Sequence, residues 1–339
     1  MSKKALRVLL ICHHSLVPPK NQESMEESAE GKTEFDVYRE LLHLGHSVRV
    51  VGLDDQITNL RQEVDDFSPH ICFNLMEEFN GEAIFDQNIV SYLELLGVPY
   101  TGCNPRGLML CRDKALSKKV MNYHSIPTPK FDVSRRNEKI KPLADLEYPI
   151  FVKSLSEEAS FGISQQSKVS NFDELSQRVD FIHQKTFSHA ICEEFIDGRE
   201  LYLSIYGNQR LKTTPIWELD FGNLKESHQR IATRKAKWDL NYRDKNGIKS
   251  KMAEKLPPKL QKEIAKVCKQ AFKALEINSY ARFDLRLKAD GSFYILEVNP
   301  NPNIGKDDEF AKSAEAAGTS YSNLIQNILD LGLRWAHNY

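Results

Sequence analysis

Residues 281–305 constrain the fold more than any other segment, because they carry the pattern of a β-hairpin with acids on one face. Asp290-Gly291 is a dipeptide favoured in two-residue hairpin turns, and runs rich in branched and aromatic residues flank it on both sides. A two-residue loop at this point fixes which residues oppose each other on the two strands. The side chains that this pairing places together on one face are those of Arg282, Asp284, Glu297 and Asn299.

Asp284 is expected to oppose Glu297 directly, and Arg282 to oppose Asn299. Opposed side chains in an antiparallel pair have Cβ atoms about 4.5 to 5.5 Å apart, and like charges there are destabilising. A bound cation removes that repulsion, and two carboxylates with an amide oxygen suit Mg²⁺ or the similarly hard Mn²⁺. The alternative is a solvated face on which Arg282 and Arg286 neutralise the acids.

The segment after the second strand, Asn299-Pro300-Asn301-Pro302-Asn303, favours the cation site. Its two prolines cannot continue a hydrogen-bonded ladder, so the strand is expected to end here. Polar side chains are then left where the chain turns, which is typical of the rim of a binding site.

The whole chain has the composition of an ordinary soluble protein. It has 339 residues, a net charge of −1, 27% charged residues and 41% hydrophobic residues, and this length suits two or three domains. Nothing in these values predicts a nucleic-acid partner, and no apolar run of about 18 residues predicts a membrane span. The six cysteines are scattered without a C-x-x-C pair, which argues against disulfides or a zinc knuckle and fits a reducing cytoplasm.

The first third of the chain alternates strands and helices, as an open parallel sheet does. Short apolar runs predict buried strands at residues 5–12, 47–53 and 70–75. Apolar residues at helical spacing predict one helix that ends before Gly45 and another over residues 84–96. An N-terminal α/β domain follows.

Two patterns in this first third resemble phosphate or metal sites but lack a required feature. Gly31-Lys32-Thr33 ends like a P-loop, but Glu26 stands where the motif needs its first glycine. Cys12, His13 and His14 are residue types that bind metals, but neighbouring residues at a strand end point to opposite faces. The alternation argues against a metal at this position.

A helix and a strand, each with a lysine at one end, occupy the middle of the chain. Arg112-Asp113-Lys114 opens a predicted helix that runs to residue 123, and Lys153 ends a predicted strand over residues 148–153. The polar loop that follows, residues 154–162, is rich in backbone donors that could close over phosphates. An ordinary hairpin loop is the alternative.

Residues 190–200 run from an apolar strand through Glu193 and Glu194 to a glycine turn. Such a connection can form a crevice in which exposed backbone groups form hydrogen bonds with a planar ring. Glu200 could then accept hydrogen bonds from two neighbouring hydroxyl groups of the same ligand. A plain hairpin between two strands is the alternative.

The segment from residue 230 to 262 is strongly biased, with eleven basic residues against three acids. A nucleic-acid surface needs basic residues interleaved with stacking aromatics, and only Trp238 and Tyr242 are available. A loop that folds over polyphosphate and a solvated surface both remain open. An amphipathic helix over residues 260–275 is expected to pack behind the acidic hairpin, and a last helix is expected over residues 321–335.

The order of these features resembles the ATP-grasp superfamily and, within it, the D-alanine–D-alanine ligase branch. The most specific matches are Leu-Glu-Leu-Leu-Gly-Val-Pro-Tyr-Thr-Gly at residues 93–102 and the R-x-D and E-x-N halves of the hairpin. Further matches are Phe73-Asn74-Leu75, Gly81-Glu82 and Asp113-Lys114. The resemblance covers nearly the whole chain.

The resemblance implies an ATP-grasp fold of mixed α/β and α+β class. An N-terminal open parallel sheet domain at residues 1–110 would be followed by two α+β subdomains, at residues 111–193 and 194–339, that clamp ATP. It also implies a homodimer formed through the N-terminal domain.

The resemblance further implies a role for each site residue. The nucleotide site would consist of Lys114 and Lys153 on the phosphates, Glu193 with the backbone of Glu194 and Ile196 on adenine, and Glu200 on ribose. The reacting end would consist of Asp284, Glu297 and Asn299 on Mg²⁺, Lys237 on the γ-phosphate and Arg282 on an oxyanion. Lys237 would lie in a mobile closing loop formed by the basic segment.

The activity so implied is that of an ADP-forming, ATP-dependent carboxylate–amine ligase that joins amino-acid-like substrates through an acyl phosphate. The alternatives are a small-molecule kinase on the same scaffold and a nucleotide-binding regulatory protein without turnover. This chain has Val17-Pro18-Pro19-Lys20 in place of a glycine-rich segment of the family, and Ala159 and Trp238 at the positions of a serine and a tyrosine. We therefore expect substrates other than D-alanine.

Overall fold

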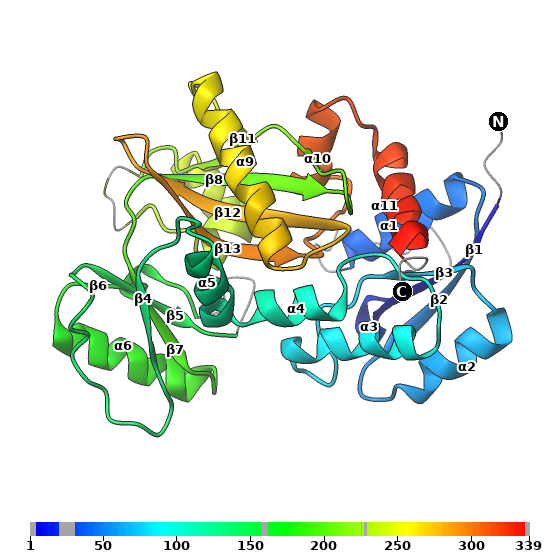
Figure 1. The fold of residues 1–339 in the computed structure, drawn as a ribbon, viewed down its shortest axis with the longest axis horizontal. Helices are drawn as coiled ribbons and strands as arrows, with labels where there is room; N and C mark the ends of the chain where they lie inside the picture. Colours follow the sequence, from blue (N-terminus) through cyan, green and yellow to red (C-terminus); the bar gives the residue numbers. More distant parts are fainter. Residues whose placement is uncertain (1–4, 20–30, 157–161, 225, 227–228, 336–339) are drawn as a thin grey trace.

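The computed structural model describes residues 5–19, 31–156, 162–224, 226 and 229–335. These residues form one parallel sheet and two antiparallel sheets, with helices packed on them (Figure 1). The predicted combination of an open parallel sheet followed by α+β units is confirmed.

The N-terminal sheet is parallel and has the order β2-β1-β3, with β1 (Arg7–His13) at its centre. The apolar run of β1 is buried, as predicted for a strand covered on both faces. The other elements of this unit are α1 (Lys32–His43), β2 (Ser47–Leu53), α2 (Thr58–Phe67), β3 (Ile71–Asn74), α3 (Asp86–Leu95) and α4 (Pro105–Arg112). The last helix of the chain, α11 (Tyr321–Trp335), packs against α1 and β3 (Figure 1).

The central sheet is antiparallel and has the order β4-β7-β5-β6. Helix α6 covers it at the end of the molecule farthest from the N-terminal sheet (Figure 1). Its elements are β4 (Phe131–Ser134), β5 (Ile150–Ser154), β6 (Lys168–Val169), α6 (Phe172–Lys185) and β7 (Ala190–Glu194), and α5 (Lys114–Tyr123) precedes them.

The large sheet is antiparallel, in the order β11-β10-β8-β12-β13 with β9 paired to β8. Its elements are β8 (Arg199–Tyr206), β9 (Lys212–Thr213), β10 (Trp217–Asp220), α7 (Arg234–Trp238), α8 (Leu240–Asn246), β11 (Lys249–Met252), α9 (Pro258–Ala274), β12 (Tyr280–Leu287), β13 (Phe293–Pro300) and α10 (Glu309–Ala316). The apolar face of α9 shares a buried core with β12 and β13, so the predicted packing behind the hairpin is confirmed.

The hairpin of β12 and β13 brings together the residues that the sequence predicts, although its turn is different. Asp284 pairs with Glu297, and Arg282 pairs with Asn299. The expected two-residue turn at Asp290-Gly291 is wrong, because the loop contains three residues.

The three-residue loop, residues 289–291, is closed by a hydrogen bond from the N–H of Lys288 to the carbonyl of Ser292. Gly291 has a φ of +88°, the left-handed conformation that such loops require at their last position. One residue more in the loop shifts the register of the two strands by one.

A β-bulge in β13 then shifts the register back. Leu285 pairs with Ile295 while Asp284 pairs with Glu297, so Leu296 has no opposite residue. The predicted pairing at the acidic face is therefore right because two one-residue differences cancel. Bulges bend a strand and are frequent beside active sites.

The bulge adjoins a contact with the segment that leads to β4. The N–H of Ile295 donates to the carbonyl of Pro127, and its carbonyl accepts from the Thr128 hydroxyl, each at 2.9 Å. These two hydrogen bonds lie on the edge of β13 that does not pair with β12.

The chain between β7 and β8 passes from the central sheet to the large sheet. Strand β7 pairs with β4 and β5, whereas β8 pairs with β9, β10 and β12. The alternative of a plain hairpin over residues 190–200 is therefore wrong.

The basic segment, for which a loop over polyphosphate and a solvated surface were the open predictions, contains regular structure. It forms the short helices α7 and α8 and the edge strand β11. Thr233 and Asp239 cap the two helices through their side-chain oxygens, and Ala236 and Ile248 are buried beneath them. Local capping and a small apolar core outweigh the repulsion of the charges.

His13 and His14 do not point to opposite faces. Strand β1 ends at His13 and a 3₁₀ turn begins at His14, so the alternation of a strand no longer applies. Their rings lie with centroids 4.5 Å apart and both approach the Asp54 carboxylate. The argument from alternation against a metal at this position is therefore wrong.

Candidate functional site

The acidic face of the hairpin lies on the large sheet and is strongly charged. Arg282 binds Asp284 through two hydrogen bonds, at 2.7 Å from Nε and 3.0 Å from Nη2. Lys237 of α7 reaches the same carboxylate, with 3.7 Å between Nζ and Oδ2. The ring of Tyr202 lies beneath both cations. Asp284 is thus held by two positive groups from different elements.

Glu297, opposite Asp284, is surrounded by cations. Lys153 Nζ lies 3.9 Å from Glu297 Oε2. Burial raises the pKa of the Glu297 carboxyl, but nearby cations outweigh burial and lower that pKa from 4.5 to about 2. These cations are Lys153, Lys114, Lys237 and Arg282. Glu297 is therefore ionised at neutral pH.

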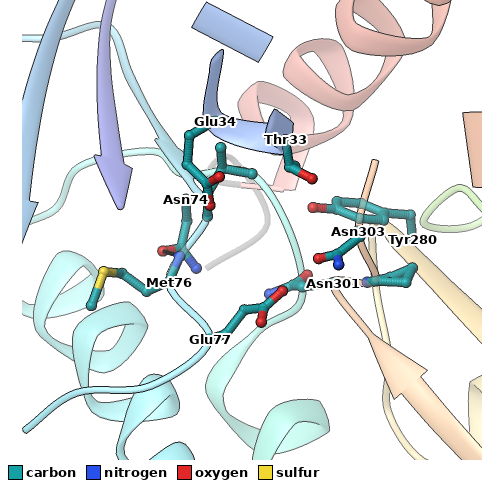
Figure 2. Close-up of a pocket in the computed structure, with 10 residues that line it drawn as sticks. Thr33, Glu34, Asn74, Met76, Glu77, Tyr280, Asn301 and Asn303 are labelled. Carbon is teal, nitrogen blue, oxygen red and sulfur yellow. Dashed lines mark hydrogen bonds between the residues drawn. The ribbon is translucent and has the colours of Figure 1, made fainter. Parts of the chain in front are cut away.

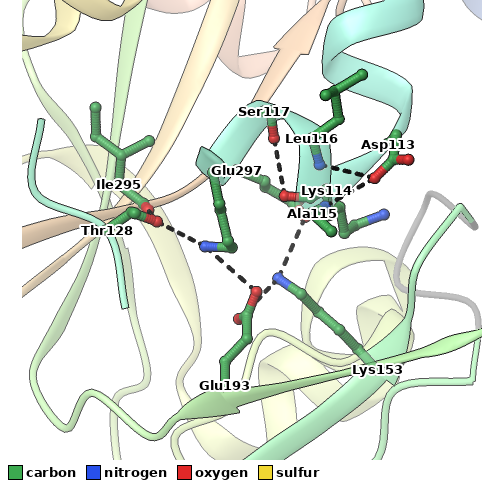
Figure 3. A network of polar contacts seen from close by, with 11 residues as sticks. Asp113, Lys114, Ala115, Leu116, Ser117, Thr128, Lys153, Glu193, Ile295 and Glu297 are labelled. Carbon is green, nitrogen blue, oxygen red and sulfur yellow. Dashed lines mark hydrogen bonds and ion pairs between the residues drawn. The ribbon is translucent and has the colours of Figure 1, made fainter. Parts of the chain in front are cut away.

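A buried ion network continues from Glu297 into the central sheet (Figure 3). Lys153 of β5 lies 3.2 Å from the Glu193 carboxylate of β7, and Lys118 of α5 lies 3.3 Å from its other oxygen. Lys118 also donates to the Thr128 hydroxyl at 2.8 Å. The network joins the central sheet, α5 and the hairpin.

Lys118 was not among the predicted site residues. It is fully buried, and burial lowers its pKa to about 8 although Glu193 opposes that shift. Its spacing of four from Lys114 places both lysines on one side of α5. That spacing was the signal that could have identified Lys118.

Lys114 is positioned by the cap of its helix. The Asp113 carboxylate accepts from the N–H groups of Ala115 and Leu116, both at 2.9 Å, which fixes the first turn of α5. Lys114 is buried, and it contributes to the low pKa of Glu297. Figure 3 shows it beside Glu297 and Lys153.

Glu200 lies on β8 and is buried against an arginine. Arg286 Nε is 2.5 Å from Glu200 Oε2, and the same guanidinium donates to the carbonyls of Gly198 and Arg230. Burial raises the pKa of the Glu200 carboxyl, and Arg286 opposes that change. Arg286 therefore ties β8 to the linker before it and to the start of the basic segment.

Glu194 and Ile196 lie where the chain leaves the central sheet. The Glu194 N–H donates to the carbonyl of Lys130, and the Phe195 N–H donates to the carbonyl of Pro149. Ile196 is buried. This linker thus lies between the two antiparallel sheets that carry Glu193 and Glu200.

The predicted residues converge, and positive charge is in excess among them. Five cationic side chains, Lys114, Lys118, Lys153, Lys237 and Arg282, surround three carboxylates, Glu193, Asp284 and Glu297. Such an excess suits an anion with several charges, such as a polyphosphate. Asp284, Glu297 and Asn299 form an oxygen-donor set of the kind that a hard divalent cation prefers.

A small pocket lies beside this face, between α1, the end of β3 and the segment after β13 (Figure 2). Glu34 in its wall is buried, and burial raises the pKa of its carboxyl. Asn74 is 1% exposed, and its Nδ2 has no hydrogen-bond partner among the described residues. Glu77 and Tyr280 complete this part of the wall.

Asn301 and Asn303 bring the predicted rim of the site into this pocket. Asn301 has a positive φ of 51°, and its Oδ1 accepts from the N–H of Cys103 at 2.7 Å. The segment after β13 is thus fixed to the chain between α3 and α4. The predicted position Ala159 lies outside the described residues, whereas Trp238 is exposed on α7.

In the part of the chain that the structure describes, no helix has both the length and the apolar character needed to cross a membrane. The six cysteines, all within the described residues, form no disulfide, and all are buried.

The sequence comparisons relate this chain to known ligases. Residues 114–330 match the family model described as the D-ala D-ala ligase C-terminus. An uncharacterised protein y4sG of Sinorhizobium fredii is 35% identical over 264 residues, which cover 78% of this chain and 75% of that protein. The D-alanine–D-alanine ligase of Bacillus anthracis is 31% identical over 278 residues, which cover 81% of this chain and 84% of the ligase.

The solved structures support the same fold. A Bacillus anthracis D-alanine–D-alanine ligase complexed with ATP has a TM-score of 0.75 at 24% identity, over 98% of this chain and 99% of that one. The ligase from Coxiella burnetii has a TM-score of 0.71 at 18% identity, over 98% and 95%. On the extent of these matches, the chain belongs to the D-alanine–D-alanine ligase family of ATP-dependent, ADP-forming C–N ligases.

Proposed function

We propose that this protein joins an amino-acid-like carboxylate to an amine through an acyl phosphate, with Mg²⁺-ATP as the phosphoryl donor and with a substrate other than D-alanine. The observation that carries the proposal is the opposition of Asp284 and Glu297 within a group of cations. The cations around these two acids favour a polyphosphate, which would bring the divalent ion with it.

The nucleotide would be held between the two antiparallel sheets. Lys114, Lys153 and Lys237 would contact its phosphates, and their approach to Glu297 and Asp284 supports this role. Glu193, Glu194 and Ile196 would bind adenine, and Glu200 would bind ribose. Lys118 would act through Glu193, because both are buried and in contact.

The metal would be held by Asp284, Glu297 and Asn299, whose oxygens suit Mg²⁺ or Mn²⁺. The divalent ion would supply charge neutralisation for the phosphoryl group that is transferred. Asn299 is consistent with this role, since its Nδ2 has no protein partner among the described residues and its amide is free to turn its oxygen toward a cation.

The chemistry follows from the weakness of a carboxylate as an electrophile. A substrate carboxylate oxygen attacks the γ-phosphorus, the bond from that phosphorus to ADP breaks, and an acyl phosphate forms. An amine nitrogen then attacks the acyl carbon, phosphate leaves, and the nitrogen loses a proton. Arg282 would stabilise the tetrahedral oxyanion, since it uses only two of its N–H groups on Asp284.

The pocket of Figure 2 would take the amino group of a substrate. Tyr280 precedes Arg282 by two residues on β12, a spacing of about 6.6 Å along a strand. The pocket therefore adjoins the reacting end. The carboxylates of Glu34 and Glu77 suit an ammonium group, and the asparagine-rich wall supports a substrate with more polar atoms than D-alanine.

The test is phosphate release by the purified full chain with ATP, Mg²⁺ and a panel of amino acids and small amines. The proposal expects phosphate only with the right pair, and mass spectrometry should show a product formed with loss of water. ADP formation without free phosphate would instead indicate a kinase. Failure to bind Mg²⁺-ATP would refute the proposal.

A further inference from the structure

A second group of metal-binding side chains lies at the carboxyl edge of the N-terminal sheet. His13 ends β1, His14 begins the following turn and Asp54 follows β2. Glu78, which follows β3, completes the group. The carboxyl ends of parallel strands meet at one edge, which is where open α/β sheets bind ligands.

The distances in this group suit one metal ion. His13 Nε2 lies 3.6 Å from Asp54 Oδ1 and 3.7 Å from Glu78 Oε1, and His14 Nδ1 lies 3.7 Å from Asp54 Oδ2. Ligand atoms of His13, His14 and Asp54 all lie within 4.8 Å of one another. Tetrahedral zinc with bonds of about 2.1 Å has ligand atoms about 3.4 Å apart, so small rotations of the side chains are sufficient.

The backbone holds the ligands in place. A Cβ atom on Gly52 would lie 2.9 Å from His14 Cα and 2.6 Å from the Val17 side chain, so a glycine is needed for the turn to lie on β2. The N–H of Asn80 donates to the carbonyl of Asp54 at 2.8 Å, which ties the loop carrying Glu78 to the end of β2.

Ser15 orients the ring of His13. The Nδ1 of His13 lies 2.7 Å from the Ser15 hydroxyl. The Ser15 backbone N–H donates to the same Nδ1 at 3.3 Å. These contacts turn Nε2 toward Asp54 and Glu78.

We propose that His13, His14 and Asp54, with Glu78 beside them, bind one divalent metal ion of the zinc class. Imidazole and carboxylate ligands suit Zn²⁺, whereas Mg²⁺ prefers oxygen ligands alone. Three protein ligands and partial exposure leave a position for water or a substrate group. This site is independent of the proposed ligase site on the hairpin.

The test is competition for Zn²⁺ between a chromophoric chelator and the full chain. The protein is first freed of metal and is then kept in millimolar Mg²⁺ with a non-hydrolysable ATP analogue. The wild-type chain is expected to bind one Zn²⁺ through this site. His13→Ala/His14→Ala should weaken that binding by more than about 100-fold, because loss of a mere outer partner costs about 10- to 100-fold. Ser15→Ala should therefore weaken it by about 10-fold.

The matched control is His43→Ala/His124→Ala, which removes two exposed imidazoles elsewhere and should leave Zn²⁺ binding unchanged. Asp54→Asn, nearly isosteric, tests the site without a change in side-chain volume. X-ray absorption at the zinc edge should show two imidazole ligands in the wild type. Equal Zn²⁺ affinity of the wild type and the His13/His14 variant, or no Zn²⁺ binding by either, would overturn the proposal.

The experiments distinguish failure of the ligase proposal from failure of the metal proposal. Mg²⁺-ATP binding is expected to be the same in the His13/His14 variant as in the wild type, since neither histidine lies in the nucleotide site. Loss of Zn²⁺ binding with intact nucleotide binding supports this inference, whatever the phosphate-release assay shows.

Discussion

Replacement of Glu297 by glutamine tests the electrostatics of the hairpin most directly. Glutamine has nearly the shape of the protonated acid, so the variant removes the charge and keeps the volume. Nearby cations lower the pKa of Glu297 from 4.5 to about 2, a difference of about 2.5 units, and each unit is worth about 1.4 kcal/mol. This gives an upper limit of about 3.5 kcal/mol.

Partial exposure reduces that limit. The Glu297 side chain is 26% exposed, so solvent screens part of the interaction, and we expect a loss of about 1 to 3 kcal/mol in the free energy of unfolding at pH 7. Because the pKa is depressed in the folded state, the stabilisation is fully present above about pH 4.5 and is lost as the pH falls toward 2. The difference between wild type and variant should shrink over that interval.

The assay is urea unfolding of both proteins without nucleotide, from neutral pH down to the lowest pH at which each remains folded. Glu263→Gln, an exposed carboxylate on α9, is the matched control and should cost less than about 0.5 kcal/mol. A Glu297→Gln cost as small as this control, or a cost that does not change with pH, would refute the reasoning. Phosphate release by Glu297→Gln should also be abolished.

Three further changes test other parts of the site. The pKa of Lys118 is lowered from 10.5 to about 8 in the folded protein. As the pH is raised from 8 to 10.5, the free energy of unfolding of the wild type should therefore rise by up to about 3 kcal/mol relative to Lys118→Met. Urea unfolding of both proteins measures this difference. Arg282→Lys should lower phosphate release by about 10²- to 10³-fold with nearly unchanged ATP affinity, because one ammonium cannot replace the guanidinium donors. Gly102→Ala places a Cβ 2.6 Å from Asn301 Oδ1 and should lower kcat/KM for the amino substrate by up to about 10²-fold while ATP affinity is kept.

The elements with strong local signals could be predicted from the sequence. Helix α11 runs over residues 321–335 as expected, and β1 and β2 follow the predicted apolar runs. The pairing of Asp284 with Glu297 was also right, but the turn chemistry behind it was not. An Asp-Gly dipeptide is compatible with loops of two or three residues, and the compensating bulge adjoins hydrogen bonds of Ile295 to a distant segment, which no local pattern contains.

The rest of the site depends on tertiary contacts that no local pattern contains. Lys118 becomes part of the network because α5 faces the central sheet, and Glu34 becomes a pocket residue because the start of α1 faces the segment after β13. The basic segment has the charge of a solvated loop, yet Thr233 and Asp239 give it helix caps that outweigh composition. Charge bias alone therefore predicts neither the structure nor the position of Lys237.

The two candidate cation sites differ in ligand type, and that difference can keep their metals apart. The hairpin offers Asp284, Glu297 and Asn299, all oxygen donors, in surroundings so positive that a cation without its phosphate partner is opposed by the lysines. The strand-end group offers imidazole nitrogens, which Mg²⁺ binds poorly and zinc-class ions bind well. Mg²⁺ should therefore enter mainly together with ATP, whereas a zinc-class ion should bind the N-terminal sheet with or without nucleotide. Zinc affinity that depended strongly on the ATP analogue would contradict this separation.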